Sequence, residues 1–252
     1  MITSRTNQFV SHIKQLNTSK KYRHKHYQIV LETERTILDT ITHRSTLIDY
    51  ILTTSKHTNI IKLAEQNNIK LLICDDNCAS YCAHVHNCVG CFAVINFPRW
   101  ELDNKPHNLA ICIASITNPA NLGSILRNAH AFGCDVIYRF GNSCDLLHPE
   151  CVRASAGNMF SIPIYDLKEN DISRYLKQYN CWALDSNSHT TISETKTSKH
   201  LCFILGSETG FKTMPIKPNH TCQIPMHNNV DSLNVAATSA IILHTFSKLS
   251  SN

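Results

Sequence analysis

The sequence lacks an apolar run long enough to cross a membrane. Its longest mainly apolar segment, residues 109–116, is about eight residues long, whereas a membrane-spanning helix needs roughly 20. The N-terminus also lacks the apolar core that a secretory signal requires. We therefore expect a protein of the cytoplasm with no membrane among its partners.

Acidic residues are absent from residues 1–31, which contain six Lys or Arg. A mitochondrial transit peptide is the alternative interpretation, although this segment is rich in Lys and His rather than Arg. The formal net charge of +5 is concentrated in residues 1–105, which carry 13 Lys+Arg against 9 Asp+Glu, whereas residues 106–252 carry 11 against 10. The basic excess therefore belongs to the N-terminal part.

Within that part, the cations Lys20, Lys21 and Arg23 alternate with tyrosine and histidine. Cations beside stackable rings are typical of a surface that binds a polyanion. The alternative is a solvated, charged first helix and loop.

The 12 cysteines do not indicate a disulfide framework, because such frameworks belong to short secreted chains. Residues 74–91 concentrate cysteine and histidine, and the last two of these cysteines have the two-residue spacing of a zinc knuckle. The cluster consists of Cys74, Cys78, Cys82, His84, His86, Cys88 and Cys91. Because cysteine and histidine are frequent throughout the chain, we expect buried thiols here and no metal, with a zinc site as the alternative.

The alternation of apolar and polar segments predicts two α/β domains in a chain of 252 residues. The first has expected strands at 29–31, 47–52, 70–74 and 90–95 and expected helices at 34–41 and 58–67. A polar segment with prolines, 98–107, separates it from the second. We place the domains at residues 1–105 and 106–252.

The second domain alternates strands with helices, which argues for a mostly parallel sheet covered on both faces. We expect strands at 109–116, at 135–139, near 162 and 182 and at 201–205, and helices at 122–132, near 150–157 and at 232–249. Residues 190–200 are polar and are expected to form an exposed loop. We find no internal repeat.

Three segments of this second domain have features of a ligand site. Residues 118–133 follow the strand at 109–116 as a loop that becomes a helix, and residues 203–211 are a buried strand that breaks at Gly206. Residues 224–237 pass from a strand end through a polar loop into the last helix. A helix N-terminus offers free backbone N–H groups, and glycine lets a ligand approach the backbone closely.

In this order and spacing, the three segments closely resemble the three motifs of the SpoU family of RNA ribose methyltransferases, part of the SPOUT class. The resemblance implies a C-terminal domain in which a deep trefoil knot grips S-adenosylmethionine, preceded by a small α/β substrate-binding domain. It also implies an RNA substrate and a homodimer. The N-terminal part resembles that substrate-binding domain more loosely, through residues such as Lys21-Tyr22-Arg23 and Val89-Gly90.

The resemblance also assigns the site residues. Cofactor contacts are expected from Leu205, Gly206, Ile224, Met226, Ser232 and Leu233. Arg127 of the first motif is implicated in catalysis, with Asn121 fixing the ribose hydroxyl or the arginine. Since a guanidinium with a pKa above about 12 is a poor base, orienting the acceptor and stabilising charge is easier to defend than proton abstraction. The role of Arg127 stays open.

Three further residues have expected supporting roles. Asn234 would steady the turn before the last helix, while Glu208 and Ser232 would hold the loops in register. Ser232 would also suit a helix N-cap. The second motif, Gly206-Ser-Glu208-Thr-Gly210-Phe211, is one residue shorter than the family pattern, so the turn after Glu208 must differ.

RNA contacts are expected from Lys20, Lys21 and Arg23, and Arg153 would contact either an RNA phosphate or a second subunit. Ribosomal RNA is the first choice of substrate, because the two-domain form resembles the family's ribosomal members, and transfer RNA follows. A silent RNA-binding or ribosome-assembly protein with the same fold is the alternative from another class. An enzyme that methylates a base nitrogen agrees less well with Asn121 and Arg127.

Overall fold

We describe the fold from a computed structural model, in which residues 1–84, 90–195, 199–206, 218–227, 230 and 232–247 are described. Backbone contacts divide the chain into two units. The first contains Met1–Arg99 and Asp145–Gly157, and the second contains Trp100–Cys144 and Asn158–Asn252. The first division lies close to the expected boundary at 105–106, whereas residues 145–157, expected in the second domain, group with the first unit.

The first unit is a four-stranded mixed sheet with helices on both faces. Its strands lie in the order β1-β4-β2-β3, and only β2 and β3 are parallel. Its elements are α1 (Gln8–Thr18), α2 (Lys20–His26), β1 (Gln28–Leu31), α3 (Glu34–Arg44), a 3-10 turn (Ser45–Leu47), β2 (Ile48–Thr53), α4 (Thr58–Gln66), β3 (Leu71–Ile73), α5 (Asp76–Cys82), β4 (Cys91–Asn96) and α7 (Pro149–Ser155).

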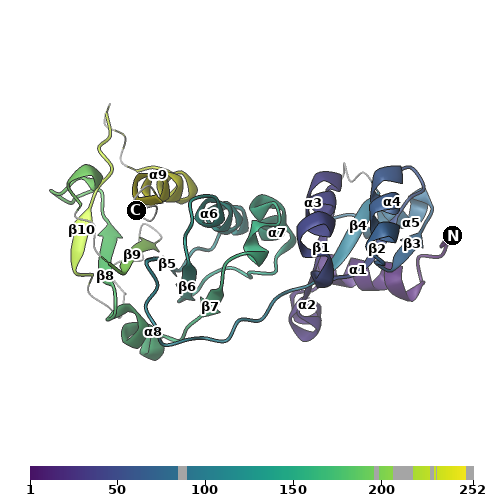
Figure 1. The fold of residues 1–252 in the computed structure, drawn as a ribbon, viewed down its shortest axis with the longest axis horizontal. Coiled ribbons are helices and arrows are strands. Elements are labelled where there is room, and N and C mark those ends of the chain that lie inside the picture. Colours follow the sequence, from purple (N-terminus) through teal and green to yellow (C-terminus); the bar gives the residue numbers. More distant parts are fainter. Residues whose placement is uncertain (85–89, 196–198, 207–217, 228–229, 231, 248–252) are drawn as a thin grey trace. The chain divides into compact units, whose positions relative to one another are not determined.

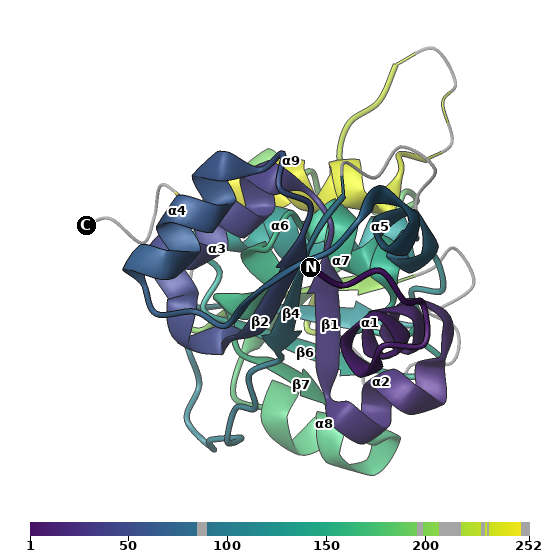
Figure 2. The ribbon, with the colours of Figure 1, turned by 90° about the vertical axis from the view of Figure 1, so that its right-hand side faces the viewer.

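Alternation of side chains along the strands explains the two covered faces. Figure 2 shows α3 and α4 beside one face of this sheet and α1, α2 and α5 beside the other. On the α1 side, Val10, Ile13 and Leu16, spaced three residues apart, are buried against the strand residues Tyr50 and Phe92. The first unit therefore has its own core.

The second unit contains a six-stranded sheet in which every pairing is parallel, in the order β10-β8-β9-β5-β6-β7. The expectation of a mostly parallel sheet is thus confirmed. Its elements are β5 (Leu109–Ala114), α6 (Pro119–Ala131), β6 (Val136–Phe140), a 3-10 turn (Asn158–Phe160), β7 (Ile164–Asp166), α8 (Glu169–Leu176), β8 (Asn180–Leu184), a 3-10 turn (Ile192–Glu194), β9 (Leu201–Gly206), β10 (His220–Cys222) and α9 (Val235–Ser247).

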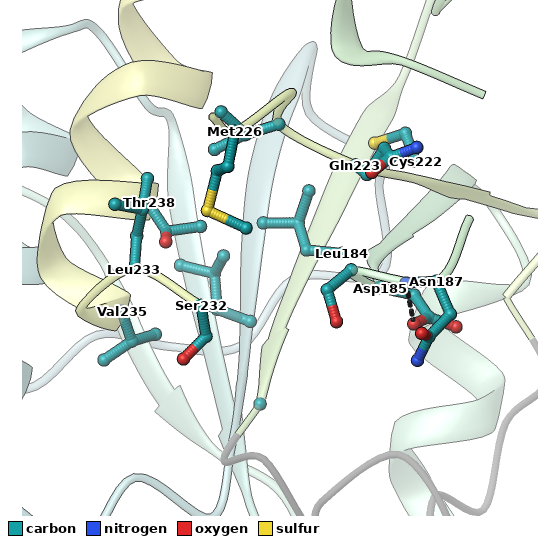
Figure 3. A pocket seen from close by; sticks show the side chains of 14 residues that line it. Leu184, Asp185, Asn187, Cys222, Gln223, Met226, Ser232, Leu233, Val235 and Thr238 are labelled. Atoms are coloured by element: carbon teal, nitrogen blue, oxygen red, sulfur yellow. Dashed lines mark hydrogen bonds between the residues drawn. The ribbon is translucent and has the colours of Figure 1, made fainter. Parts of the chain in front are cut away.

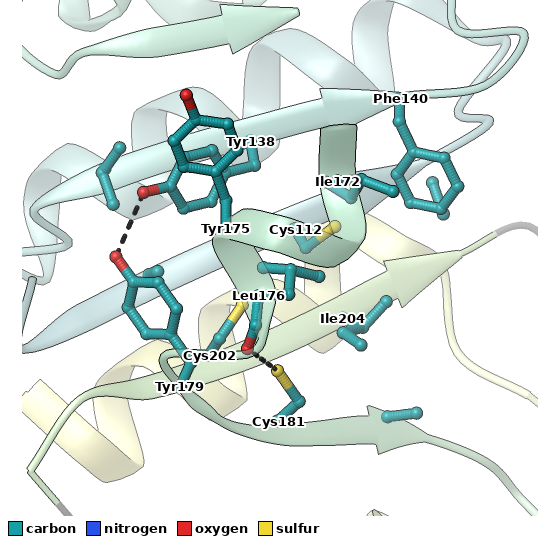
Figure 4. Packing of buried hydrophobic residues seen from close by; sticks show 14 residues of the cluster. Cys112, Tyr138, Phe140, Ile172, Tyr175, Leu176, Tyr179, Cys181, Cys202 and Ile204 are labelled. Carbon is teal, nitrogen blue, oxygen red and sulfur yellow. Dashed lines mark hydrogen bonds between the residues drawn. The ribbon is translucent and has the colours of Figure 1, made fainter. Parts of the chain in front are cut away.

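Helices cover both faces of this sheet. In Figure 1, α6 and α9 lie on one side of the strands and α8 on the other. On the α8 side, Figure 4 shows the ring of Tyr138 packed among Tyr175, Tyr179 and Cys202, with the Tyr138 and Tyr179 hydroxyls 3.1 Å apart. On the opposite side, Phe203 of β9 packs against Phe246 of α9 with ring centroids 4.7 Å apart.

The strand order fixes where a ligand site can form. From β5 the chain runs outward through β6 and β7, and it then returns to build β8, β9 and β10 on the opposite side of β5. The order therefore reverses between β5 and β9. In open parallel sheets, ligands bind outside the carboxyl ends of the strands at such a reversal. The first and second motifs follow these two strands.

The sequence-based elements differ from the observed ones in several places. The last helix begins at Val235 rather than at 232, and α5 and α8 were not expected. The strand expected to end at residues 224–226 is β10, which ends at Cys222. Residues 190–200, expected to be an exposed loop, contain a short 3-10 turn in which Ile192 is buried. Of the helices in the described ranges, none has the length and apolar character to cross a bilayer.

Candidate active site

A cavity of about 250 Å³ lies where β8, β9 and β10 end and α9 begins. Figure 3 shows side chains from these elements converging on it. It is lined by Leu184, Asp185, Ser186, Asn187, Leu205, Gly206, Cys222, Gln223, Ile224, Met226, Ser232, Leu233, Val235 and Thr238.

The two sides of this cavity differ in chemistry. In Figure 3, Met226, Leu233 and Val235 lie on one side together with the hydroxyls of Ser232 and Thr238. Asp185 and Asn187 lie on the other side, and Leu184 stands between the two. An apolar wall suits a purine ring, and a polar wall suits hydroxyl and charged groups. The cavity therefore fits a ligand with one flat apolar end and one polar end, as an adenosine-containing cofactor has.

All six residues expected to contact the cofactor line this one cavity, although β9 and the segment before α9 are far apart in sequence. The segment Asp185-Ser186-Asn187, which was not among the expected site residues, also lines the cavity. A signal for this segment was present, because three polar residues follow directly after the apolar strand β8. The carboxyl end of a parallel strand is where such residues reach a ligand.

The loop before α6 is held against the loop after β6. The backbone N–H of Ser115 donates to the carbonyl of Phe140 at 3.2 Å, and that of Cys144 donates to the carbonyl of Ile116 at 2.8 Å. Gly141 has a φ of +71°, and a Cβ there would collide with the Ser115 hydroxyl. Glycine is therefore needed at this crossing, which fixes the chain that enters the first motif.

Hydrogen bonds set the start of α6. Asn118 is its N-cap, with the side-chain oxygen accepting from the backbone N–H of Asn121 at 3.0 Å, and Pro119 is its first residue. Both are favoured at these positions. The side chain of Asn121 then accepts a hydrogen bond of 3.1 Å from the side-chain amide of Asn234. The first and third motifs are therefore in direct contact.

The start of α9 is fixed by the same asparagine. The side-chain oxygen of Asn234 accepts from the backbone N–H of Ala236 at 2.8 Å, so the capping role considered for Ser232 is provided by Asn234 instead. Asn128 of α6 donates to the carbonyl of Ala236 and to the hydroxyl of Ser239, both at 2.9 Å. Two amides of α6 thus position the first turn of α9 beside the cavity.

Arg127 lies on the exposed surface of α6 and not on the cavity wall. It is about 120° around the helix axis from Asn121, at 100° per residue. Its guanidinium makes no hydrogen bond or ion pair with any other residue that the structure describes. Of the other expected residues, Ser232 lines the cavity and Glu208 lies outside the described residues.

The expected RNA-contacting residues divide into two groups. Lys20, Lys21 and Arg153 are exposed, as a phosphate contact requires. Arg23 is only 4% exposed, and its guanidinium donates to Asp145 at 2.7 and 3.2 Å and to the carbonyl of Leu16 at 2.9 Å. The expectation for Arg23 is therefore wrong in this structure, because its donors already have partners inside the first unit.

The described cysteines of the segment 74–91 are buried. Burial raises the pKa of Cys74 to about 11 and raises that of Cys78, so these thiols hold their protons near neutral pH. Zinc binds the thiolate. Among the residues that the structure describes, no three His, Cys, Asp or Glu side chains are grouped as metal ligands. His86 and Cys88 lie outside the described residues.

The sequence profile of the SpoU rRNA Methylase family matches residues 108–244, more than half of the chain. The chain therefore belongs to this family, and the resemblance seen in the three motifs is confirmed. The 23S rRNA (uridine(2479)-2'-O)-methyltransferase of Streptomyces viridochromogenes is 25% identical over 165 residues. That alignment covers 60% of this chain and 58% of the relative, so the chain spans less than two thirds of the relative's length.

Solved structures share the fold of the whole chain. The AdoMet-bound rRNA methyltransferase of Sinorhizobium meliloti has a TM-score of 0.81 at 21% identity, covering 98% of this chain and 95% of the other. The SpoU methyltransferase AviRb of Streptomyces viridochromogenes, in complex with AdoMet, has a TM-score of 0.82 at 17% identity, covering 97% and 98%. At these identities the likeness establishes the fold.

Proposed function

We propose that this protein is an S-adenosylmethionine-dependent methyltransferase that methylates a ribose 2′-hydroxyl in ribosomal RNA. The observation that carries the proposal is the single cavity formed by the second and third motifs and tied to the first motif through Asn121 and Asn234. The family membership of residues 108–244 supports it. The bound cofactor would supply an electrophilic methyl group.

The chain's own residues would bind and orient the two substrates. Leu205, Ile224 and Leu233 offer apolar surface for the adenine, and the backbone at Gly206 allows it to approach closely. Arg127 would orient the acceptor ribose and stabilise the charge that develops on its oxygen, because a guanidinium stays protonated and donates in a fixed geometry. Asn121, already held by Asn234, would keep the start of α6 in place.

The substrate proposal rests on the relatives and on charge. The relative described above is named for methylation of a uridine in 23S rRNA, and the structure from Sinorhizobium meliloti is named an rRNA methyltransferase. Lys20 and Lys21 are exposed on α2, where RNA phosphates could pair with them. We therefore assign residues 1–105 to RNA binding and residues 106–252 to methyl transfer.

A homodimer with a knotted catalytic domain is part of the same proposal. Ile241 is 38% exposed, and the exposed Ala237 four residues before it lies on the same side of α9, so the two form an apolar stripe on the helix surface. A second copy would cover this apolar stripe and could bring its Arg127 to a cavity that Arg127 does not line in its own chain. The knot is the topology expected of the family.

Transfer of labelled methyl from S-adenosylmethionine to unmodified ribosomal and transfer RNA tests the function, with the product mapped by 2′-O-methyl-sensitive sequencing. Label at one ribose of ribosomal RNA supports the proposal, and label in transfer RNA changes the substrate. Base methylation would contradict it. The absence of label from naked RNA and from assembled ribosomal particles, with cofactor binding intact, would favour the silent RNA-binding alternative.

Size-exclusion chromatography with light scattering tests the dimer. We expect the wild-type protein at about twice the chain mass of 28.5 kDa and Ile241→Asp shifted toward the monomer, because a buried charge at an apolar interface is costly. Gln178→Asp is the control, since Gln178 is exposed just after α8, away from α9, and is already polar. A wild-type monomer at micromolar concentration would contradict the dimer.

A further inference from the structure

The cofactor cavity contains one carboxylate among the described residues that line it, that of Asp185. Asp185 is the first residue after β8 and is half-buried. No cation among the described residues lies within ion-pair distance of it. A carboxylate that faces a ligand cavity and has no cation of the protein beside it can accept hydrogen bonds from a ligand.

The backbone fixes the direction of this carboxylate. Its Oδ1 accepts from the backbone N–H of Asn187 at 2.9 Å, as the dashed line in Figure 3 shows. The backbone N–H of Asp185 donates to the carbonyl of Cys222 at 3.0 Å, and its carbonyl accepts from Ser188 at 3.1 Å. Oδ2 has no hydrogen-bond partner in the part of the chain that is described, so it can accept from a ligand.

The turn that carries Asp185 is fastened to the neighbouring strand. Ser188, 7% exposed, donates its hydroxyl to the carbonyl of Thr221 at 3.0 Å, and the Thr221 hydroxyl lies 3.1 Å from that of Ser188. The carboxylate is therefore held in place before a ligand arrives, and binding would not have to order it.

The neighbour of Asp185 indicates which part of the cofactor it meets. Leu184 stands in Figure 3 between the apolar wall and the polar wall, and Asp185 is the next residue. In an adenosyl group the ribose is bonded directly to the adenine, whereas the ammonium of the methionine lies beyond C5′, the sulfur and three carbons. The hydroxyls of Ser232 and Thr238 lie on the apolar side itself, and Asp185 is the charged group that follows Leu184. A ligand whose adenine contacts the apolar side therefore presents its ribose to Asp185 before its ammonium.

We propose that Asp185 accepts hydrogen bonds from the ribose hydroxyls of the adenosyl group and makes the cavity selective for ribonucleosides over deoxyribonucleosides. The inference rests on the proposed function, because it assumes an adenosyl ligand. Hydroxyls donate and a carboxylate accepts, and hydrogen bonds to a charged acceptor are stronger than those between neutral groups. An acidic side chain recognises the ribose of nucleotide cofactors in other α/β folds by the same chemistry.

Isothermal titration calorimetry with three ligands tests this assignment. S-adenosylhomocysteine contains both the ribose and the amino acid, 5′-methylthioadenosine contains the ribose without the amino acid, and its 2′,3′-dideoxy counterpart lacks the hydroxyls. The variants are Asp185→Ala and Asp185→Asn. Asp171→Asn is the control, since it removes an exposed carboxylate on α8. Circular dichroism checks that each variant is folded.

We expect Asp185→Ala to weaken both S-adenosylhomocysteine and 5′-methylthioadenosine by about ten- to 100-fold, as the loss of a charge-assisted hydrogen bond predicts. Asp185→Asn, which can still accept from Asn187, should show an intermediate loss. In the wild-type protein, removing the ribose hydroxyls from the ligand should lower its affinity about as much as Asp185→Ala does. In the Asp185→Ala variant, removing the same hydroxyls should change the affinity little.

Four results would overturn the inference. If Asp185→Ala weakens the binding of S-adenosylhomocysteine but not that of 5′-methylthioadenosine, the carboxylate binds the ammonium. If the wild-type protein binds the ribose and dideoxyribose ligands with equal affinity, the carboxylate binds no hydroxyl. The latter comparison uses the wild-type protein, so it stands even if a variant fails to fold. If the wild-type protein does not bind S-adenosylhomocysteine, the proposed function fails as well. If the wild-type protein binds it tightly and the Asp185 variants bind it equally tightly, only this inference is rejected.

Discussion

The side-chain amide of Asn234 donates a hydrogen bond of 3.1 Å to the side-chain oxygen of Asn121, across 113 residues of sequence. The two residues belong to different motifs, and each also sets a helix start: the backbone N–H of Asn121 is bound by the cap of α6, and Asn234 caps α9. The contact therefore couples the loop carrying Ser232 and Leu233, which line the cavity, to the helix carrying Arg127.

This coupling is measurable by a double-mutant cycle. Asn121→Ala should weaken binding of S-adenosylhomocysteine by roughly fivefold, because a neutral hydrogen bond contributes about 1 kcal/mol. Once Asn234→Ala has removed the donor, Asn121→Ala should have almost no further effect. Calorimetric affinities of the four proteins give the coupling. Additive losses would show that the two side chains act independently.

Arg127 should affect methyl transfer without affecting cofactor affinity. It lies on the exposed surface of α6 and off the cavity wall, so Arg127→Ala should leave the Kd for S-adenosylhomocysteine nearly unchanged. Loss of a group that stabilises developing charge should lower kcat by about 100-fold or more. Radiolabelled methyl transfer and calorimetry measure the two quantities.

The control for Arg127→Ala is Arg174→Ala, which removes an exposed arginine of α8 in the same unit. It should change neither rate nor affinity. A loss of cofactor affinity in Arg127→Ala equal to its loss of rate would place this arginine in the cofactor site and contradict the assignment.

The sequence predicted the parts of the second unit that depend on local pattern. The apolar segments at 109–116 and 201–205 correspond to β5 and β9, because strands buried on both faces are continuously apolar. The six motif residues that line the cavity could be named because the motifs are specific in type and spacing. The segment Asp185-Ser186-Asn187 after β8 was not predicted as part of the site, because an Asp-Ser-Asn sequence is equally typical of an ordinary surface turn. Only the fold shows which residues surround it.

Arg23 shows what composition could not reveal. In a stretch of lysine, arginine and histidine, it reads as one more surface cation, and its partner Asp145 is 122 residues away. Only the fold shows that this side chain is buried while Lys20 and Lys21 are exposed. Fully buried arginines are rare unless paired, and the pair is a long-range contact without a sequence signature.

The exposed lysines of α2 should therefore contribute to RNA binding. Lys20→Ala and Lys21→Ala should each weaken binding to RNA of any sequence. In the double variant, the slope of the logarithm of the binding constant against the logarithm of the salt concentration should fall by the equivalent of about one to two phosphate contacts. Fluorescence anisotropy across a salt series measures the slope. Lys62→Ala, an exposed lysine of α4, is the control. An unchanged slope in the double variant would exclude α2 from the RNA interface.

Asp145 and Arg23 should contribute to stability in a pH-dependent way. Burial opposes ionisation of Asp145, but hydrogen bonds from Arg23 and His24 outweigh it and hold the pKa of the carboxyl below its usual range. A carboxyl whose pKa is lower in the folded state stabilises the fold above the pKa of the unfolded chain, about 4, and loses this contribution as the pH falls through the folded pKa.

At pH 7, Asp145→Asn should lower the free energy of unfolding by about 3 kcal/mol, because it leaves the buried guanidinium of Arg23 without its charge partner. The difference from wild type should shrink below about pH 4, where this carboxyl takes up a proton in the unfolded chain but not yet in the folded one, and it should vanish once the folded-state carboxyl is protonated as well. Urea denaturation between pH 3 and 7 measures both, at roughly 25 °C. Asp76→Asn, which removes an exposed pair with Lys56, should cause little change at any pH. A difference between wild type and Asp145→Asn that stays constant down to pH 3 would mean that the ionised carboxylate is not its source.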